Sequence, residues 1–381
     1  MKNRIMMACL LLASISPAEA YATEIGLGTI LPLSGPSAVT GLNVAHGVEL
    51  AVEQLNASGG LLGQKIKWTL KDDESTPAVG VSRANELVAE GVKAHVGGYN
   101  SPVVLAYQPV FTRANIVDIS VIPKVDEVLT GGGNPLAIKL PSANAMDGEI
   151  LAKILIDKIH AKKVAFLTQN DVYGENTQLH VENGLKKLGN GQVKVVATEK
   201  FPFGNTDFRN TLETIRLSGA DAIMVTNSSQ EAGMPALLQQ IQELDVEIPV
   251  LEMIGGIGDI TLDVAGKAAD GVWSVGVYYP NTKPFSEIPE NQKFVEAYIK
   301  KFGKSPDHFA AAGYAGTQLW AEAVRRTGTL DRKAVAGTIR GGTFPSIYGE
   351  YKIDANGQAS GVYVPFQVKD GKRVPFELSG D

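Results

Sequence analysis

Cysteine, excess charge and long apolar runs are all scarce in this sequence of 381 residues. Its single cysteine is Cys9, so a chain that loses the N-terminal segment has no disulfide and no thiolate chemistry. Lys+Arg number 35 and Asp+Glu 41, and a net charge of -6 gives no basic surface for nucleic acid. No later stretch approaches ~18 uncharged apolar residues, so we expect no membrane insertion of the mature chain.

The N-terminus has the features of an export signal. Lys2 and Arg4 precede an apolar run over 5–15, and a small-residue pattern of the Ala-x-Ala type ends at Ala20. This order is typical of a secretory signal peptide over 1–20, with Ala22 as a competing cleavage position. We therefore expect a periplasmic protein whose stability comes from packing.

Strand and helix patterns alternate along the rest of the chain, in two successive series. Strand patterns occur before Pro141 at 24–33, 65–70, 94–96 and 116–121, and after it at 163–168, 193–199, 222–226 and 249–253. Hydrophobic residues make up 44% and charged residues 20%, which is globular composition. The sequence predicts an α/β fold with two similar doubly wound parallel-sheet domains.

Signatures of catalysis and of cofactor binding are weak. Gly26-Leu27-Gly28 begins like a dinucleotide fingerprint, but it lies inside a strand and lacks the third glycine. The five histidines have no metal-binding spacing, and Asp72-Asp73-Glu74 fits a solvated loop better than a calcium site. No nucleophile elbow is present. We expect no enzyme activity, no cofactor and no metal.

Loops that follow the predicted strands carry amides, hydroxyls and aromatic rings. Tyr99, Asn100 and Ser101 follow one strand, and Tyr173 follows another at the start of a helix. Ligands of open α/β sheets bind at the carboxyl ends of the strands. These loops therefore predict a site for a small polar molecule.

Several motifs, in order, resemble those of the leucine/isoleucine/valine-type periplasmic binding proteins, the substrate-binding components of ABC importers. They are Ile30-Leu31-Pro32-Leu33-Ser34-Gly35-Pro36, Ala51-Val52-Glu53-Gln54-Leu55-Asn56, Gly59-Gly60-Leu61-Leu62-Gly63, Asp72-Asp73, Asp171-Val172-Tyr173-Gly174, Asn205-Thr206-Asp207-Phe208 and Val264-Ala265-Gly266-Lys267-Ala268-Ala269-Asp270-Gly271. The resemblance implies two lobes joined by three crossovers, 24–141 plus 275–346 and 142–274 plus 347–381. It implies a monomer that closes on a small-molecule ligand by a hinge movement and delivers it to an inner-membrane ABC permease. An exported enzyme or a sensory receptor on the same fold is the alternative.

The resemblance also implies positions for ligand contacts. Ser101 matches a serine that contacts the ligand carboxylate, and Tyr173 matches the tyrosine of the second lobe. The loop 120–124 departs from the family pattern and places Ile122 and Lys124 there. Ser228 falls where leucine binders have a second tyrosine.

The partner of a ligand ammonium is open. Ile254 aligns with the acidic position, and Glu252 lies close by. If Glu252 reaches the cleft, a neutral aliphatic or aromatic amino acid fits, which the family favours slightly. If Ile254 faces the cleft, an ammonium is desolvated without a partner. An amine-free organic or aromatic acid held by Ser101 and Lys124 then fits better.

Overall fold

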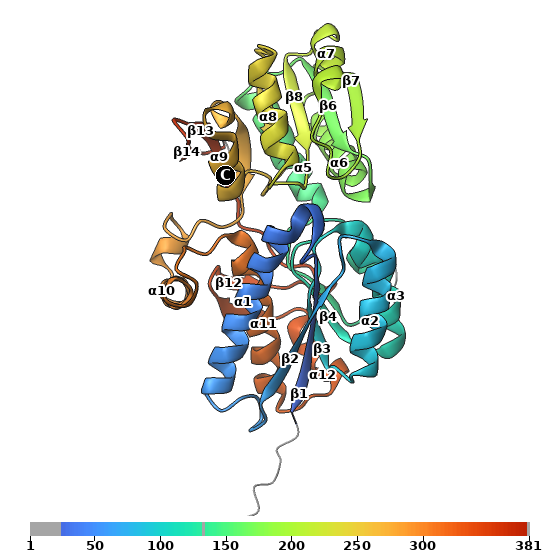
Figure 1. The fold of residues 1–381 in the computed structure, drawn as a ribbon, viewed down its shortest axis with the longest axis vertical. Coiled ribbons are helices and arrows are strands. Elements are labelled where there is room, and N and C mark those ends of the chain that lie inside the picture. Colours follow the sequence, from blue (N-terminus) through green and yellow to red (C-terminus); the bar gives the residue numbers. More distant parts are fainter. Residues whose placement is uncertain (1–23, 132–133, 379–381) are drawn as a thin grey trace, which may run out of the picture.

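The computed structural model describes residues 24–131 and 134–378, and the signal-peptide prediction lies outside this part of the chain. The described residues form two lobes, each built on its own β-sheet (Figure 1). In this part of the chain, no helix combines the length and the apolar character needed to cross a membrane.

The first lobe has a five-stranded parallel sheet in the order β2-β1-β3-β4-β5. Its strands are β1 (Ile25–Leu31), β2 (Ile66–Asp72), β3 (Ala94–Gly97), β4 (Val117–Ser120) and β5 (Ala137–Lys139). Its helices are α1 (Ala38–Ala57), α2 (Pro77–Ala89), α3 (Ser101–Ala114), α4 (Glu127–Thr130), α10 (Pro289–Phe302), α11 (His308–Thr327) and α12 (Arg332–Ile339), with short 3-10 turns at Gly35–Ser37 and Phe285–Glu287. A hairpin of β11 (Thr343–Ser346) and β12 (Gly349–Lys352) completes the lobe.

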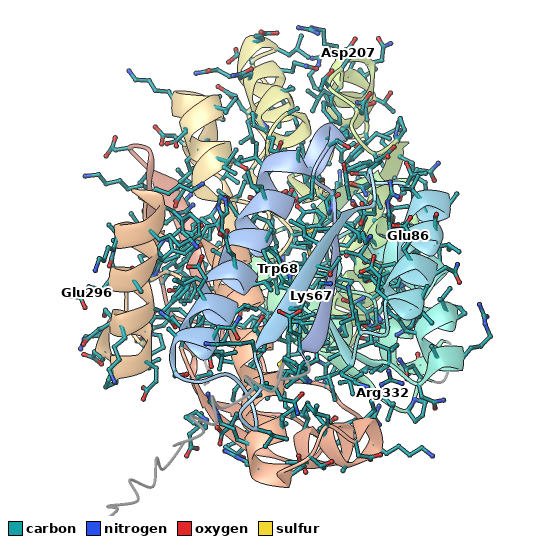
Figure 2. The ribbon with its side chains drawn as sticks, turned by 60° about the horizontal axis from the view of Figure 1, so that its bottom comes forward. Lys67, Trp68, Glu86, Asp207, Glu296 and Arg332 are labelled. Carbon is teal, nitrogen blue, oxygen red and sulfur yellow. The ribbon has the colours of Figure 1, made fainter. Side chains whose placement is uncertain are left out.

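Helices cover both faces of this sheet because its strands are apolar on both sides. Leu27 and Leu31 pack against α1 and α11, whereas Ile30 packs against α2 and α3. Burying one such side chain contributes roughly 1.5–3 kcal/mol. Figure 2 shows Lys67 and Trp68 on the edge strand β2, where Trp68 Nε1 donates to Thr29 Oγ1 of β1 at 2.8 Å.

The second lobe has a seven-stranded sheet in the order β14-β13-β10-β9-β8-β6-β7. The parallel strands are β6 (Lys163–Gln169), β7 (Lys194–Phe201), β8 (Ala222–Thr226), β9 (Val250–Glu252) and β10 (Trp273–Gly276), and the antiparallel edge is β13 (Val364–Lys369) with β14 (Lys372–Pro375). The helices are α5 (Asn144–Asp157), α6 (Val172–Leu188), α7 (Arg209–Leu217), α8 (Gly233–Glu243) and α9 (Asp259–Ala265), followed by a 3-10 turn at Gly266–Ala269. One core lies under α5 and α6 and another under α7 and α8.

The chain passes between the lobes after β5, after β10 and before β13. The last passage differs from the predicted boundary at residue 347. Tyr351, Ile353 and Ala359 belong to the core of the first lobe, and Gln358 bridges to Lys139 of β5. The third crossover therefore lies near 360–363, because the apolar residues before it are buried under α11 and α12.

Helix α3 begins at Ser101, and Asn100 stands at its N-cap position. Pro102 occupies the first turn, where the missing N–H costs nothing, and Pro109 is accommodated inside the helix. The loop Asp72-Asp73-Glu74, predicted to be solvated, contains one fully buried residue, Asp73.

Candidate ligand-binding site

A cavity of about 1070 Å³, which includes space open to solvent, lies between the two lobes. Its walls come from the carboxyl ends of β3 and β4 in the first lobe and of β6, β8 and β9 in the second. Parallel strands bring their carboxyl ends to one edge, so the loops from both sheets meet here.

Eight of the nine residues predicted for ligand contact line this one cavity. They are Tyr99, Asn100, Ser101, Ile122, Lys124, Tyr173, Ser228 and Ile254. The ninth, Glu252, lies behind the wall. Residues as far apart in the sequence as Tyr99 and Ile254 are thus brought together, while their binding role stays a prediction.

Aromatic and apolar side chains make up much of the wall. Tyr99 and Phe309 have ring centroids 5.5 Å apart, and Tyr348 and Tyr351 are 5.3 Å apart. Burial raises the pKa of Tyr173 well above its ordinary value, so its hydroxyl is a neutral donor. The sequence analysis missed Phe309, Tyr348 and Tyr351. They come from late segments that carry no motif.

His308 also lines the cavity and was missed. Its ring lies 3.8 Å from that of Phe309. Burial, helped by Arg373 and Lys124, lowers its pKa to about 3. His308 is therefore neutral at physiological pH and supplies no charge for a ligand.

Lys124 brings a cation to the cavity. Its Nζ donates to Ser142 Oγ at 2.9 Å and to Asp147 Oδ2 at 2.8 Å, and its side chain is 12% exposed. An ammonium has three donors, so one remains beyond these two partners. Lys124 can therefore contribute a charge-assisted hydrogen bond to an anionic ligand.

Ile254 and Glu252 take opposite positions with respect to the cavity. Ile254 lines it, whereas the Glu252 side chain is fully buried, and its carboxyl group lies where a Cβ on the cavity residue Gly256 would stand. Glu252 Oε1 accepts from Asn227 N at 3.2 Å, and within the described part of the chain Oε2 has no partner. Burial raises the pKa of Glu252 well above its ordinary value. A carboxyl that is buried behind the wall does not face the cavity and gives a ligand ammonium no direct partner.

Polar groups of the second lobe at the cavity are hydrogen-bonded to one another. Gln169 Oε1 accepts from Ser228 Oγ at 2.7 Å, and Gln169 Nε2 donates to Asp171 Oδ2 at 2.5 Å. Asp171 Oδ1 also caps α6 by accepting from Gly174 N at 3.0 Å. Asp171 lines the cavity, although α6 and Gln169 already use its two oxygens.

Direct contacts join the lobes around the cavity. Glu231 Oε1, from the loop before α8, accepts from Thr40 N of α1 at 2.8 Å. Tyr99 Oη lies 3.5 Å from the Ser228 carbonyl oxygen, and Asn176 Nδ2 donates to Glu127 Oε1 at 3.3 Å. The described conformation is thus one in which the lobes touch at several points.

No group of three or more His, Cys, Asp and Glu within 24–131 and 134–378 could hold a metal ion. What the cavity does offer is hydroxyls and amides, aromatic faces, one lysine and the Asp171 carboxylate, which already accepts hydrogen bonds from Gln169 and Gly174. This equipment can hold a small molecule by its shape and by a few hydrogen bonds.

Comparison with known proteins agrees with this architecture. Residues 24–373 match the family described as "Periplasmic binding protein". A relative from Brucella abortus (strain 2308), "Leu/Ile/Val-binding protein homolog 1", is 27% identical over 337 residues, which are 87% of this chain and 86% of that protein.

Two solved structures superpose on nearly the whole chain. A solute-binding protein of an ABC transporter from R. palustris, in complex with benzoate, has a TM-score of 0.83 and 25% identity and covers 93% of this chain and 96% of its own. A branched-chain amino acid substrate-binding protein from Streptococcus pneumoniae, in complex with isoleucine, has a TM-score of 0.81 and 24% identity and covers 92% and 98%. This chain belongs to the periplasmic binding protein family, whose pattern covers residues 24–373.

Proposed function

We propose that this protein is the periplasmic substrate-binding component of an ABC importer and that it captures an amine-free aromatic carboxylic acid. The observation that carries this choice is the placement of two side chains, Ile254 at the cavity wall and Glu252 behind it. Ile254 lines the cavity, whereas the Glu252 carboxyl is fully buried and lies against Gly256 behind the wall. A ligand ammonium at this wall would lose its water without gaining a partner, which costs several kcal/mol.

The rest of the cavity suits such an acid. Lys124 and Ser101 supply donors for a carboxylate, and Tyr99, Tyr348 and Phe309 supply aromatic faces. Offset or edge-to-face contacts between rings add about 0.5–1.5 kcal/mol each beyond burial. The R. palustris neighbour in complex with benzoate supports the same class of ligand.

A neutral amino acid is the second candidate, and Asp171 is the observation in its favour. Asp171 lines the cavity with a carboxylate that could accept from an ammonium if it released Gln169. The curated relatives named for leucine, isoleucine and valine also support this candidate, which the sequence favours slightly. We rank it second because both Asp171 oxygens already accept hydrogen bonds from the protein.

We further propose that the two lobes close on the ligand by a hinge movement. The lobes would be 24–141 plus 275 to about 359, and 142–274 plus the remaining C-terminal residues. Ligand stabilises the closed form only if it binds that form more tightly, and contacts from both walls of one cavity supply this difference. The protein would act as an exported monomer, without catalysis, and would hand its ligand to an inner-membrane permease.

A thermal-shift screen tests the function. Purified chain lacking residues 1–20 is heated with benzoate, substituted benzoates, leucine, isoleucine and phenylalanine. A ligand at about 1,000 times its Kd stabilises the folded state by ~4 kcal/mol. We expect the aromatic acids to raise the melting temperature and to be recovered unchanged. Stabilisation by amino acids alone would favour the second candidate, and turnover of the stabilising compound would contradict a receptor.

A further inference from the structure

Beneath the cavity wall, Lys124 is paired with a buried acid. Asp147 is 2% exposed, and both of its oxygens are used. Oδ2 accepts from Lys124 Nζ at 2.8 Å, and Oδ1 accepts from Ser142 Oγ at 2.6 Å and from Tyr363 Oη at 2.8 Å. Asp147 is thus hydrogen-bonded directly to Lys124, which lines the ligand cavity.

The four residues come from separate parts of the fold. Lys124 follows β4 in the first lobe, and Asp147 lies in the first turn of α5 in the second lobe. Ser142 belongs to the first crossover and Tyr363 to the third. The ion pair therefore joins the two lobes at the hinge, where two of the crossovers hold Asp147 in place.

The charges around this point cancel. A second ion pair lies beside the first, between the buried Lys139 and the partly exposed Asp126: Lys139 Nζ donates to Asp126 Oδ1 at 3.0 Å and to the Ser142 carbonyl at 2.9 Å. Each of the two lysines is therefore paired with one aspartate before a ligand arrives. A ligand carboxylate at Lys124 receives one charged donor and also meets the field of Asp147.

We infer that Asp147 is a specificity-determining residue that limits the ligand head group to one negative charge. The inference rests on the proposed function. A single carboxylate can share the Lys124 ammonium with Asp147. A head group with two charges at the same place brings more negative charge than Lys124, already paired with Asp147, can offset. Like charges in a desolvated site reject a partner strongly.

Calorimetry with three probes of similar shape tests the inference. Benzoate has one charge, benzamide has none, and phenylphosphonate has two in mildly alkaline buffer. We expect the wild-type chain to bind benzoate at least about tenfold more tightly than phenylphosphonate. Asp147→Asn keeps the size of the side chain and one of its two hydrogen-bonding oxygens and removes the charge. We expect this variant to bind benzoate about tenfold more tightly than the wild-type chain does, to bind benzamide with unchanged affinity and to bind phenylphosphonate as well.

Two further variants separate charge from structure. Tyr363→Phe removes a hydrogen bond to the same Asp147 oxygen without changing charge, so the ratio of benzoate to benzamide affinity should stay at the wild-type value. Lys124→Met should lower the affinity for benzoate about tenfold or more and leave the affinity for benzamide unchanged. Equal changes for benzoate and benzamide in Asp147→Asn, or no change, would overturn the inference and assign Asp147 a structural role.

The wild-type comparison needs no variant and covers the case in which Asp147→Asn does not fold. Wild-type binding of phenylphosphonate as tight as that of benzoate overturns the inference alone. A wild-type chain that binds no aromatic acid overturns the proposed function, and the inference falls with it.

Discussion

Glu231 and Thr40 join the two lobes at the N-terminal turn of α1. Glu231 Oε1 accepts from Thr40 N at 2.8 Å and from Thr40 Oγ1 at 3.3 Å. Thr40 N belongs to the first turn of α1, where backbone N–H groups have no partner within the helix and the helix dipole favours an anion. The contact spans 191 residues of sequence and can form only when the lobes approach.

We therefore expect Glu231→Ala to weaken ligand binding without touching the ligand. Loss of this contact should destabilise the closed form by about 1 kcal/mol, or roughly fivefold in Kd, mainly through faster dissociation. Stopped-flow dissociation of benzoate measures this. Glu243→Ala is the matched control, because Glu243 pairs with Arg209 inside the second lobe. Equal effects of the two substitutions would show that Glu231 has no special part in closure.

The packing of α1 on α11 gives a second prediction. A Cβ on Gly47 would lie 2.0 Å from the Ala310 carbonyl oxygen, and a Cβ on Gly313 would lie 2.3 Å from that of Val44. Both contacts are with backbone, which cannot move aside. We expect Gly47→Ala to lower the free energy of unfolding by about 1–3 kcal/mol or more, measured in urea.

Gly337 of α12 provides the control for this prediction. A Cβ there would meet none of the described atoms within 4 Å. Gly337→Ala should therefore stabilise the protein by up to about 1 kcal/mol through helix propensity. A destabilising Gly337→Ala, or a neutral Gly47→Ala, would contradict this account of the helix contact.

Asp73 makes stability depend on pH. Burial, with further contributions from the neighbouring acids Asp72 and Glu74, raises its pKa to about 7 from 3.8. The unfolded chain releases this proton near pH 4, whereas the folded chain holds it to about pH 7. The free energy of unfolding therefore falls as the pH rises from about 4 to about 7, and Asp73 does not change it below about pH 4. Asp73→Asn should stabilise the protein above pH 7, by at most about 4 kcal/mol, and have little effect near pH 3.

Asp72 is the matched control with the opposite sign. Burial would raise its pKa, but hydrogen bonds from the backbone N–H groups of Leu33 and Glu74 outweigh burial and lower it. Asp72→Asn should destabilise the protein at neutral pH and lose this effect in acid. Urea titrations of both variants from pH 3 to pH 8 check the prediction. Parallel curves for the two variants would contradict it.

Ile254 offers a way to reverse the ligand preference. Ile254→Asp would place a carboxylate at the wall where the proposal finds no partner for an ammonium. We expect this variant to gain affinity for phenylalanine and to lose affinity for benzoate, each by about tenfold or more. Ile254→Asn is the control, because asparagine has the size of aspartate without its charge. It should gain much less affinity for phenylalanine.

The sequence could predict which loops meet but not how each side chain turns. Tyr99, Ser101 and Tyr173 follow apolar strands, and the ends of parallel strands converge, so their meeting follows from the strand pattern. Glu252 and Ile254 are two positions apart and would share a face in a continuing strand. The strand ends at Glu252 and the chain turns at Ile254 and Gly255, so the strand alternation does not continue and the two side chains do not share a face.

Other features depend on long-range packing that leaves no local signal. Tyr348 and Tyr351 reach the cavity because the chain returns to the first lobe before its third crossover. Asp147 is helical and lacks any motif, and its role depends on Lys124 and Tyr363 from distant segments. Periodicity predicts the helix but not the partner of one acidic residue on it.

The most direct test compares phenylalanine with 3-phenylpropanoate, two ligands that differ only in the ammonium group, by titration calorimetry on the wild-type chain. A cavity with Ile254 at its wall and Glu252 behind it should bind 3-phenylpropanoate at least about 100-fold more tightly, because the ammonium would be desolvated without a partner. Tighter binding of phenylalanine would contradict the account.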